Sequence, residues 1–234
     1  MHRQRLSHRR PAVAALSARG VVAVTALALV LTGCASPHYK FVTSKDRDVV
    51  LRIPRTWNSV AASAVQKAAG ETSDASSDSS SDDWVVYFDA STKPSAQHVR
   101  ATKVTAPVLI AQSSPLPESA AASVTNDQLR DVVLPVSADG RAQLELSFTA
   151  TGRAKPKFRL IRDEEIRTKT ETGVHVVFGY DLGEGEEIFD QVAVTDPKRT
   201  RVHVLLIHCA TACFTARQTE IYSITDTFTV KKAT

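Results

Sequence analysis

The sequence contains no hydrophobic run long enough to cross a membrane. Its longest apolar run, Val21–Leu31, has eleven residues and is interrupted by Thr25. A helix rises about 1.5 Å per residue, so this run reaches only about half of a hydrocarbon core. Glycine and proline are also scarce, at 9 and 10 of 234 residues, and no internal repeat of solenoid period occurs. The composition therefore excludes multi-span membrane and collagen-like classes and leaves a globular chain of one or two domains.

The sequence also lacks the short motifs that carry catalysis or cofactor binding. It has no Gly-x-Ser-x-Gly elbow, no His-Glu-x-x-His, no phosphate loop and no dinucleotide-binding glycine motif. His98, His175 and His203 have no nucleophile signature beside them. We therefore predict no catalytic residue, no cofactor and no metal. An unrecognised envelope hydrolase is the alternative, and it requires a histidine and a carboxylate within hydrogen-bond reach of a serine or a water.

Two acidic segments invite a cation-binding interpretation. The first, Asp181 with Glu184, Glu186 and Glu187, lies in a glycine-containing turn and is explained equally well as a solvated hairpin tip. The second, Glu71–Asp83, is rich in Ser and Asp but lacks the spacing of a calcium loop. Its composition buries too little apolar surface to offset the ordering entropy, so we predict a disordered loop there.

The first 33 residues contain no acidic residue. They carry five arginines and the short apolar run, and end in Thr32 and Gly33. This arrangement is typical of a secretory signal peptide, here residues 1–33. Its removal leaves 24 basic and 25 acidic residues, so the mature chain has no bulk positive charge. We therefore expect no nucleic-acid partner.

The end of this leader, Leu31-Thr32-Gly33-Cys34, resembles the bacterial lipobox. The resemblance implies that Cys34 carries fatty acyl chains such as palmitate and becomes the first residue of the mature chain. Two or three acyl chains anchor a protein firmly, because each buried CH₂ contributes about 0.8 kcal/mol. We expect a lipid anchor in the cell membrane, on its extracytoplasmic face, and a tether over residues 34–44. Arg9-Arg10 leaves the export route, general secretion or twin-arginine, open.

With Cys34 acylated, Cys209 and Cys213 remain as a pair separated by three residues. Such a pair usually oxidises outside the cytoplasm, and a turn of the chain brings the two Cα atoms within bonding range. A metal site with His203 and His208 is the competing interpretation. In a strand these two histidines point to opposite faces, which disfavours a four-ligand cage. We therefore predict a disulfide.

Residues 45–234 are predicted to form one globular domain. Strands are expected at Val49–Ile53, Trp84–Asp89, Pro107–Gln112, Leu144–Phe148, Phe158–Thr168, Val174–Tyr180, Ile188–Thr195 and Arg201–Cys209. Helices are expected at Ser59–Ala69, Asn126–Val133 and Thr215–Phe228. The last four strands form an antiparallel meander, and we expect the C-terminal helix to cover its one buried face.

Four features then occur in a recognisable order. They are the strand and turn Arg52–Trp57, the helix Leu129–Asp131 before Pro135, the meander, and the ending Glu220–Val230. Together they resemble the PsbP-like α/β/α sandwich of actinobacterial lipoproteins of the LpqN/LpqT type. The resemblance covers about residues 40–230. It implies an α+β fold with an antiparallel sheet flanked by helices, a binding or scaffolding role at the cell envelope, and no catalytic residues.

Trp57 and Trp84 are the candidate ligand-groove residues. Aromatic side chains favour partly wet apolar sites, although core positions at strand ends explain both tryptophans as well. The binding hypothesis places a groove near these two residues and the loop Ser113–Ser123. Its partner would be an envelope protein, a glycan or a lipid.

Overall fold

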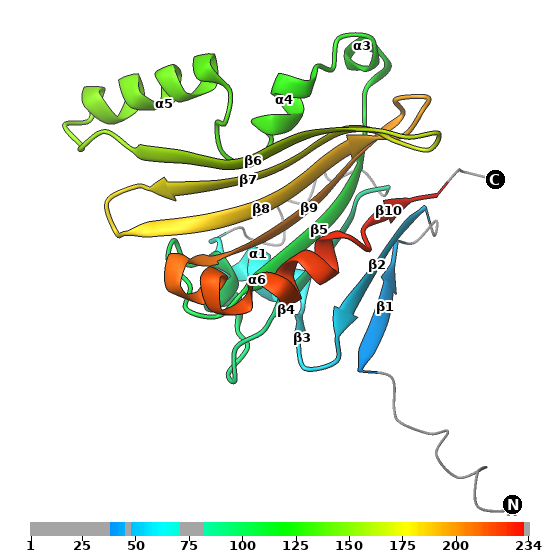
Figure 1. Ribbon diagram of the computed structural model, residues 1–234, viewed down its shortest axis with the longest axis horizontal. Coiled ribbons are helices and arrows are strands. Elements are labelled where there is room, and N and C mark those ends of the chain that lie inside the picture. The colour runs from blue at the N-terminus through cyan, green and yellow to red at the C-terminus, as the bar shows by residue number, and fades with distance from the viewer. Residues whose placement is uncertain (1–37, 45–47, 71–81, 232–234) are drawn as a thin grey trace, which may run out of the picture. The chain divides into compact units, whose positions relative to one another are not determined.

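The computed structural model describes residues 38–44, 48–70 and 82–231 (Figure 1). The predicted signal peptide, the acylation site Cys34 and residues 71–81 of the acidic loop lie outside the described residues. No helix in the described ranges combines the length and the hydropathy needed to span a bilayer. The described residues form a mixed α+β fold with antiparallel sheets and flanking helices, as predicted.

The centre of the fold is a seven-stranded antiparallel sheet. Its strands in spatial order are β3 (Asn58–Val60), β4 (Trp84–Asp89), β5 (Val108–Pro115), β9 (Arg201–Ala210), β8 (Glu186–Thr195), β7 (Thr172–Asp181) and β6 (Lys157–Arg167). The predicted meander is therefore correct, and it runs from β6 to β9. Strand β9 is central because β5 pairs with its free edge.

Both faces of this sheet are buried, as the resemblance to an α/β/α sandwich implies, whereas the meander alone was expected to bury one face. Side chains along a strand alternate between the faces. On β9, Leu205, Ile207 and Cys209 join one hydrophobic cluster, while Val204 and Leu206 join the other. A strand with apolar side chains on both faces needs a cover on each side.

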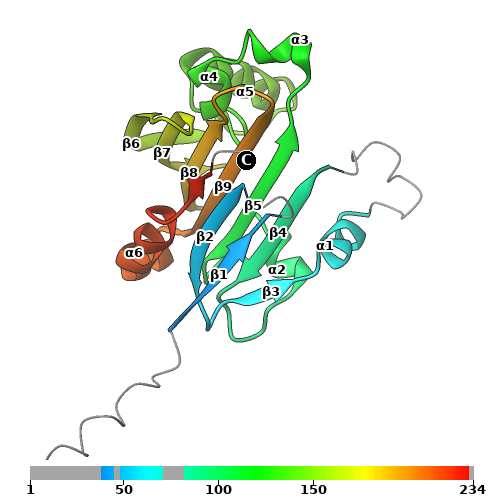
Figure 2. The same cartoon turned by 90° about the vertical axis from the view of Figure 1, so that its right-hand side faces the viewer.

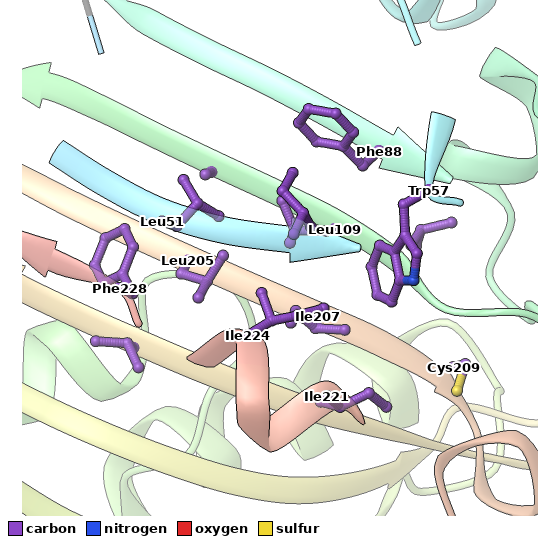
Figure 3. Close-up of a cluster of buried hydrophobic side chains, with 14 of the residues drawn as sticks. Leu51, Trp57, Phe88, Leu109, Leu205, Ile207, Cys209, Ile221, Ile224 and Phe228 are labelled. Carbon is purple, nitrogen blue, oxygen red and sulfur yellow. The ribbon is translucent and has the colours of Figure 1, made fainter. Parts of the chain in front are cut away.

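The first face is covered by a three-stranded antiparallel sheet and by helix α6 (Thr211–Thr225). The small sheet has the order β1 (Tyr39–Thr43), β2 (Val49–Pro54) and β10 (Thr229–Val230). Figure 3 shows Leu51 of β2, Leu205 and Ile207 of β9 and Ile224 of α6 pointing toward one another. Strand β1 occupies residues 39–43 of the predicted tether over 34–44, since Tyr-Lys-Phe-Val-Thr is rich in strand-forming aromatic and β-branched residues.

Helix α3 (Glu118–Ala121), which has no buried residue, precedes the two helices that cover the second face, α4 (Asn126–Arg130) and α5 (Ala138–Ala150), on the side of the sheet opposite α6 (Figure 1). Thr125 and Ser137 cap the latter two helices by accepting hydrogen bonds from backbone amides. The predicted strand Leu144–Phe148 is wrong, because these residues belong to α5. Two short helices, α1 (Ala62–Ala68) and α2 (Ala96–Arg100), contribute Val65 and Val99 to the first core.

Candidate functional site

A pocket of about 390 Å³ opens between strand β1 and helix α6. Tyr39 forms its β1 side. The α6 side consists of residues from successive turns of the helix: Ala216, Arg217, Thr219, Glu220 and Ser223. The pocket therefore combines one aromatic ring with a carboxylate, a guanidinium and hydroxyl groups.

The buried side chain of Trp57 contacts the acidic and the basic side chain of the pocket, Glu220 and Arg217. Its indole Nε1–H donates a hydrogen bond to Oε1 of Glu220 over 2.7 Å. Arg217 donates to the same carboxylate through Nε over 2.8 Å and through Nη2 over 2.9 Å. The guanidinium of Arg217 also lies 5.5 Å from the centre of the Trp57 ring. This Trp57–Glu220–Arg217 network holds two charged groups in one geometry.

These contacts set the protonation of Glu220. Partial burial raises the pKa of its carboxyl, but the hydrogen bonds from Arg217 and Trp57, together with the charge of Arg217, outweigh burial and leave the pKa below its usual value of 4.5. The carboxylate is therefore ionised at neutral pH. It faces the pocket as an acceptor with a fixed orientation.

Neither of the two predicted groove residues lines this pocket. Trp57 is 0% exposed and supports the pocket without lining it. Trp84 packs, partly buried, against the first core, and it is not among the lining residues. The segment Ser113–Ser123 is also not among them, and its first three residues belong to β5.

The predicted disulfide joins Cys209 to Cys213, with 5.9 Å between the Cα atoms. It links the end of β9 to the first turn of α6, the helix that forms most of the pocket wall. His203 and His208 lie on opposite faces of β9, as the alternation predicts: Leu205 and His203 share one face, Leu206 and His208 the other.

Three histidines lie beside carboxylates. The pairs are His98 with Asp89 at 3.0 Å, His175 with Asp190 at 2.7 Å and His208 with Glu187 at 2.7 Å. At the second pair, the hydroxyl of Thr225 donates to Asp190 over 3.1 Å. A nucleophilic triad requires the hydroxyl to bond the imidazole, with the carboxylate on its other side. Here the carboxylate is the central group, so the arrangement ties α6 to the sheet.

His203 is buried, with 1% of its surface exposed, and neither ring nitrogen has a hydrogen-bond partner among the described residues. Burial lowers the pKa of its imidazole below the usual 6.5, against the nearby charge of Asp48. The ring is therefore neutral at physiological pH. It packs as part of the first face.

The acidic cluster at the β7–β8 hairpin is divided among separate partners. Asp181 accepts hydrogen bonds from the backbone amides of Gly183 and Gly185, and Glu186 pairs with Arg159. Glu187 is buried against His208. Within the described ranges, no group of three or more His, Cys, Asp or Glu side chains is placed to hold a metal ion.

The sequence analysis missed Tyr39, Arg217 and Glu220 as site residues. Tyr39 was assigned to the tether. Two signals were available for the others: Arg217 and Glu220 stand three residues apart on a predicted helix, and a buried tryptophan needs an acceptor for its N–H group. Neither signal identifies which acceptor Trp57 uses, because Glu220 is 163 residues away in the chain.

No protein-family model matches the chain, and no curated protein sequence matches it. Three solved structures are similar to it in fold. Cyanobacterial PsbP (CyanoP) from Synechocystis has 11% identity and a TM-score of 0.47, over 86% of this chain and 99% of that one. A Pseudomonas aeruginosa protein of unknown function has 11% identity and a TM-score of 0.37, over 84% and 99%. The Ran-binding protein Mog1p of Saccharomyces cerevisiae has 10% identity and a TM-score of 0.41, over 82% and 95%.

The structural neighbours thus include a PsbP-like fold, and none of them bears on the resemblance to actinobacterial lipoproteins. With every TM-score below 0.5, the likenesses say nothing about what this chain binds.

Proposed function

We propose that the chain is a non-enzymatic binding module, held at the extracytoplasmic face of the cell membrane by acyl chains on Cys34. The observation that carries the binding role is the pocket between β1 and α6, whose Glu220 and Arg217 side chains are fixed by Trp57. Polar groups that are already in position lose little rotamer entropy when a ligand binds.

The pocket suits a polar ligand that carries hydroxyl groups, and the proposed ligand is a glycan of the cell envelope. The pocket volume of about 390 Å³ falls in the range of small-molecule sites and accommodates a sugar unit. The Glu220 carboxylate accepts hydrogen bonds from hydroxyls, and the Thr219 hydroxyl both donates and accepts. Protein partners, in contrast, are usually bound over wide surfaces of about 1,200–2,000 Å².

The hydrolase alternative has less support from the geometry. It requires a hydroxyl or a water activated by an imidazole. At the His175–Asp190 pair, the available hydroxyl of Thr225 is bonded to the carboxylate. Both members of that pair are buried.

The indole N–H group of Trp57 can report ligand binding by NMR, because it donates a hydrogen bond to Glu220 in the pocket wall. We expect the ¹⁵N–¹H indole signal of Trp57 to shift when soluble peptidoglycan fragments are added to the acylated protein in detergent micelles. The indole signal of Trp84, which lies outside the pocket, is the internal control.

Glu220→Gln weakens this response at least tenfold if the carboxylate recognises the ligand. The matched control is Glu145→Gln on α5, across the seven-stranded sheet, which leaves the response unchanged. A Trp57 signal that stays in place at saturating fragment concentrations contradicts the glycan proposal.

A further inference from the structure

The outer face of the β1–β2 hairpin exposes an unusual set of side chains. Phe41 is 74% exposed, the highest value among the large hydrophobic residues of the described chain. Its outward neighbours are Tyr39 on the same strand and Arg52, which stands directly opposite it on β2. The inward positions, such as Leu51, belong to the first core. In Figure 2 this hairpin lies at the front of the domain.

The charge of this face is of one sign. Arg52 is the one charged side chain that strand alternation places on it, because neither strand contains an Asp or a Glu. Lys40 points to the inward side, where its Nζ donates a hydrogen bond to the backbone carbonyl of Trp57 over 2.6 Å. The guanidinium of Arg52 lies 4.4 Å from the centre of the Tyr39 ring, and its Nε has no hydrogen-bond partner among the described residues. Aromatic rings beside a cation suit the boundary between lipid headgroups and acyl chains, particularly where the lipids are anionic.

Chain length brings this face close to the proposed anchor. Tyr39 follows Cys34 by five residues and Phe41 follows it by seven. An extended chain spans at most about 3.6 Å per residue, so Phe41 lies within about 25 Å of the acylated residue. The lipid surface is therefore within reach of the whole strand β1.

We infer that the outer face of the β1–β2 hairpin rests on the bilayer, with Phe41 at the boundary of the acyl chains and Arg52 beside anionic headgroup phosphates. This inference rests on the proposed anchoring through Cys34. It orients the domain, and it places the Tyr39 side of the pocket next to the membrane surface.

The test uses the acylated protein bound to vesicles of phosphatidylcholine and phosphatidylglycerol, with and without bromine in the acyl chains. The variant Phe41→Trp places a fluorescent reporter on the proposed contact face. Leu146→Trp is the matched control, because Leu146 is 70% exposed on α5, across the seven-stranded sheet. Emission is compared with that of the unmodified protein, which supplies the background from Trp57 and Trp84.

We expect the added tryptophan at the β1 position to shift to shorter wavelength and to lose about half of its emission in brominated vesicles, with no such change for Leu146→Trp. Arg52→Gln is expected to reduce this quenching only when phosphatidylglycerol is present. Vesicle flotation separates the two proposals. Protein that floats but shows equal quenching in both variants overturns the membrane-facing surface while the anchor stands, and unmodified protein that fails to float overturns both. Protection of the β1 reporter that depends on protein concentration assigns the face to a second copy and also overturns the inference.

Discussion

Glu220 accepts three hydrogen bonds from two side chains, and this makes it the residue on which the pocket geometry depends. With Trp57 alone, the Glu220 carboxylate would have a single hydrogen-bond donor. With Arg217 alone, the carboxylate would stay mobile on the surface of the helix. Hydrogen bonds to a charged group contribute more than those between neutral groups. The network therefore links the core to the wall of the pocket.

Trp57→Phe removes the indole donor and keeps most of the apolar ring. We expect it to lower the free energy of unfolding by about 2 kcal/mol, because a hydrogen bond to a charged group is lost inside the protein. Denaturant titration of the variant against the unmodified protein measures this difference. Trp84→Phe, at a partly buried position, is the control, and equal losses for the two substitutions would show that the Glu220 contact contributes nothing.

The ionisation of Glu220 makes the stability of the fold depend on pH in a defined direction. Its folded-state pKa is lowered, so its contribution to stability is fully present above the unfolded value of about 4.5 and is lost as the pH falls through the folded value. Glu220→Gln is expected to flatten the stability profile below about pH 4.5. Thermal unfolding across this range checks the effect, and a profile as steep as that of the unmodified protein is the contrary result.

His203 gives a second pH dependence near neutrality. Because burial lowers its folded-state pKa, the native ring stays neutral while the unfolded chain takes up a proton below about pH 6.5. Stability should therefore decrease as the pH falls from about 7 to about 5, and less so in His203→Gln. NMR titration of the ring protons reports the same quantity directly, and a midpoint above that of a free histidine would refute the assignment.

At the scale of elements, the disulfide fixes the start of α6 to the end of β9. Cross-linking two residues four positions apart closes a short loop, for which the chain-entropy model gives about 2 kcal/mol. We expect Cys213→Ala to lose about that much stability in denaturant titration. The protein without substitutions is treated with an alkylating reagent in the absence of reductant, and its mass should show no free thiol at Cys209 or Cys213. Alkylation of both cysteines would contradict the disulfide.

The elements that sequence reasoning located well are those with strong periodicity. Strand β9 is apolar at nearly every position, which indicates a central strand, and the turns beside it delimit β7 and β8. In α5, Leu144, Leu146 and Phe148 alternate as in a strand, and this pattern predicts a strand where the structure has a helix. The structure leaves Leu146 exposed, so the apolar residues of this helix do not follow its packed face. Strand β1 was missed because it is short and adjoins the expected tether.

The pocket depends on tertiary placement that no local pattern encodes. The helix that supplies Arg217 and Glu220 was predicted, and Trp57 was singled out. Their meeting requires β2 and α6 to lie side by side on the first face of the sheet, which brings together segments separated by 163 residues. Sequence reasoning therefore predicted the fold class, the meander and the cysteine pair, but only one member of the pocket network.

At the scale of the whole molecule, we propose a lipid anchor joined to a domain that binds an envelope ligand beside the membrane. If Cys34 is acylated as proposed, its position sets the compartment, favours the oxidation of Cys209 and Cys213 and orients β1 toward the membrane. Cys34→Ala should therefore release the protein from the membrane fraction. Persistent pelleting of this variant with membranes would show that another segment holds it there.

The most direct measurement is the mass of the N-terminal peptide of the protein recovered from its native membranes. We expect a chain that begins at Cys34 and carries the added mass of diacylglycerol and a further acyl chain. A soluble cytoplasmic protein that still begins at the leader, with an unmodified Cys34 thiol, would contradict it.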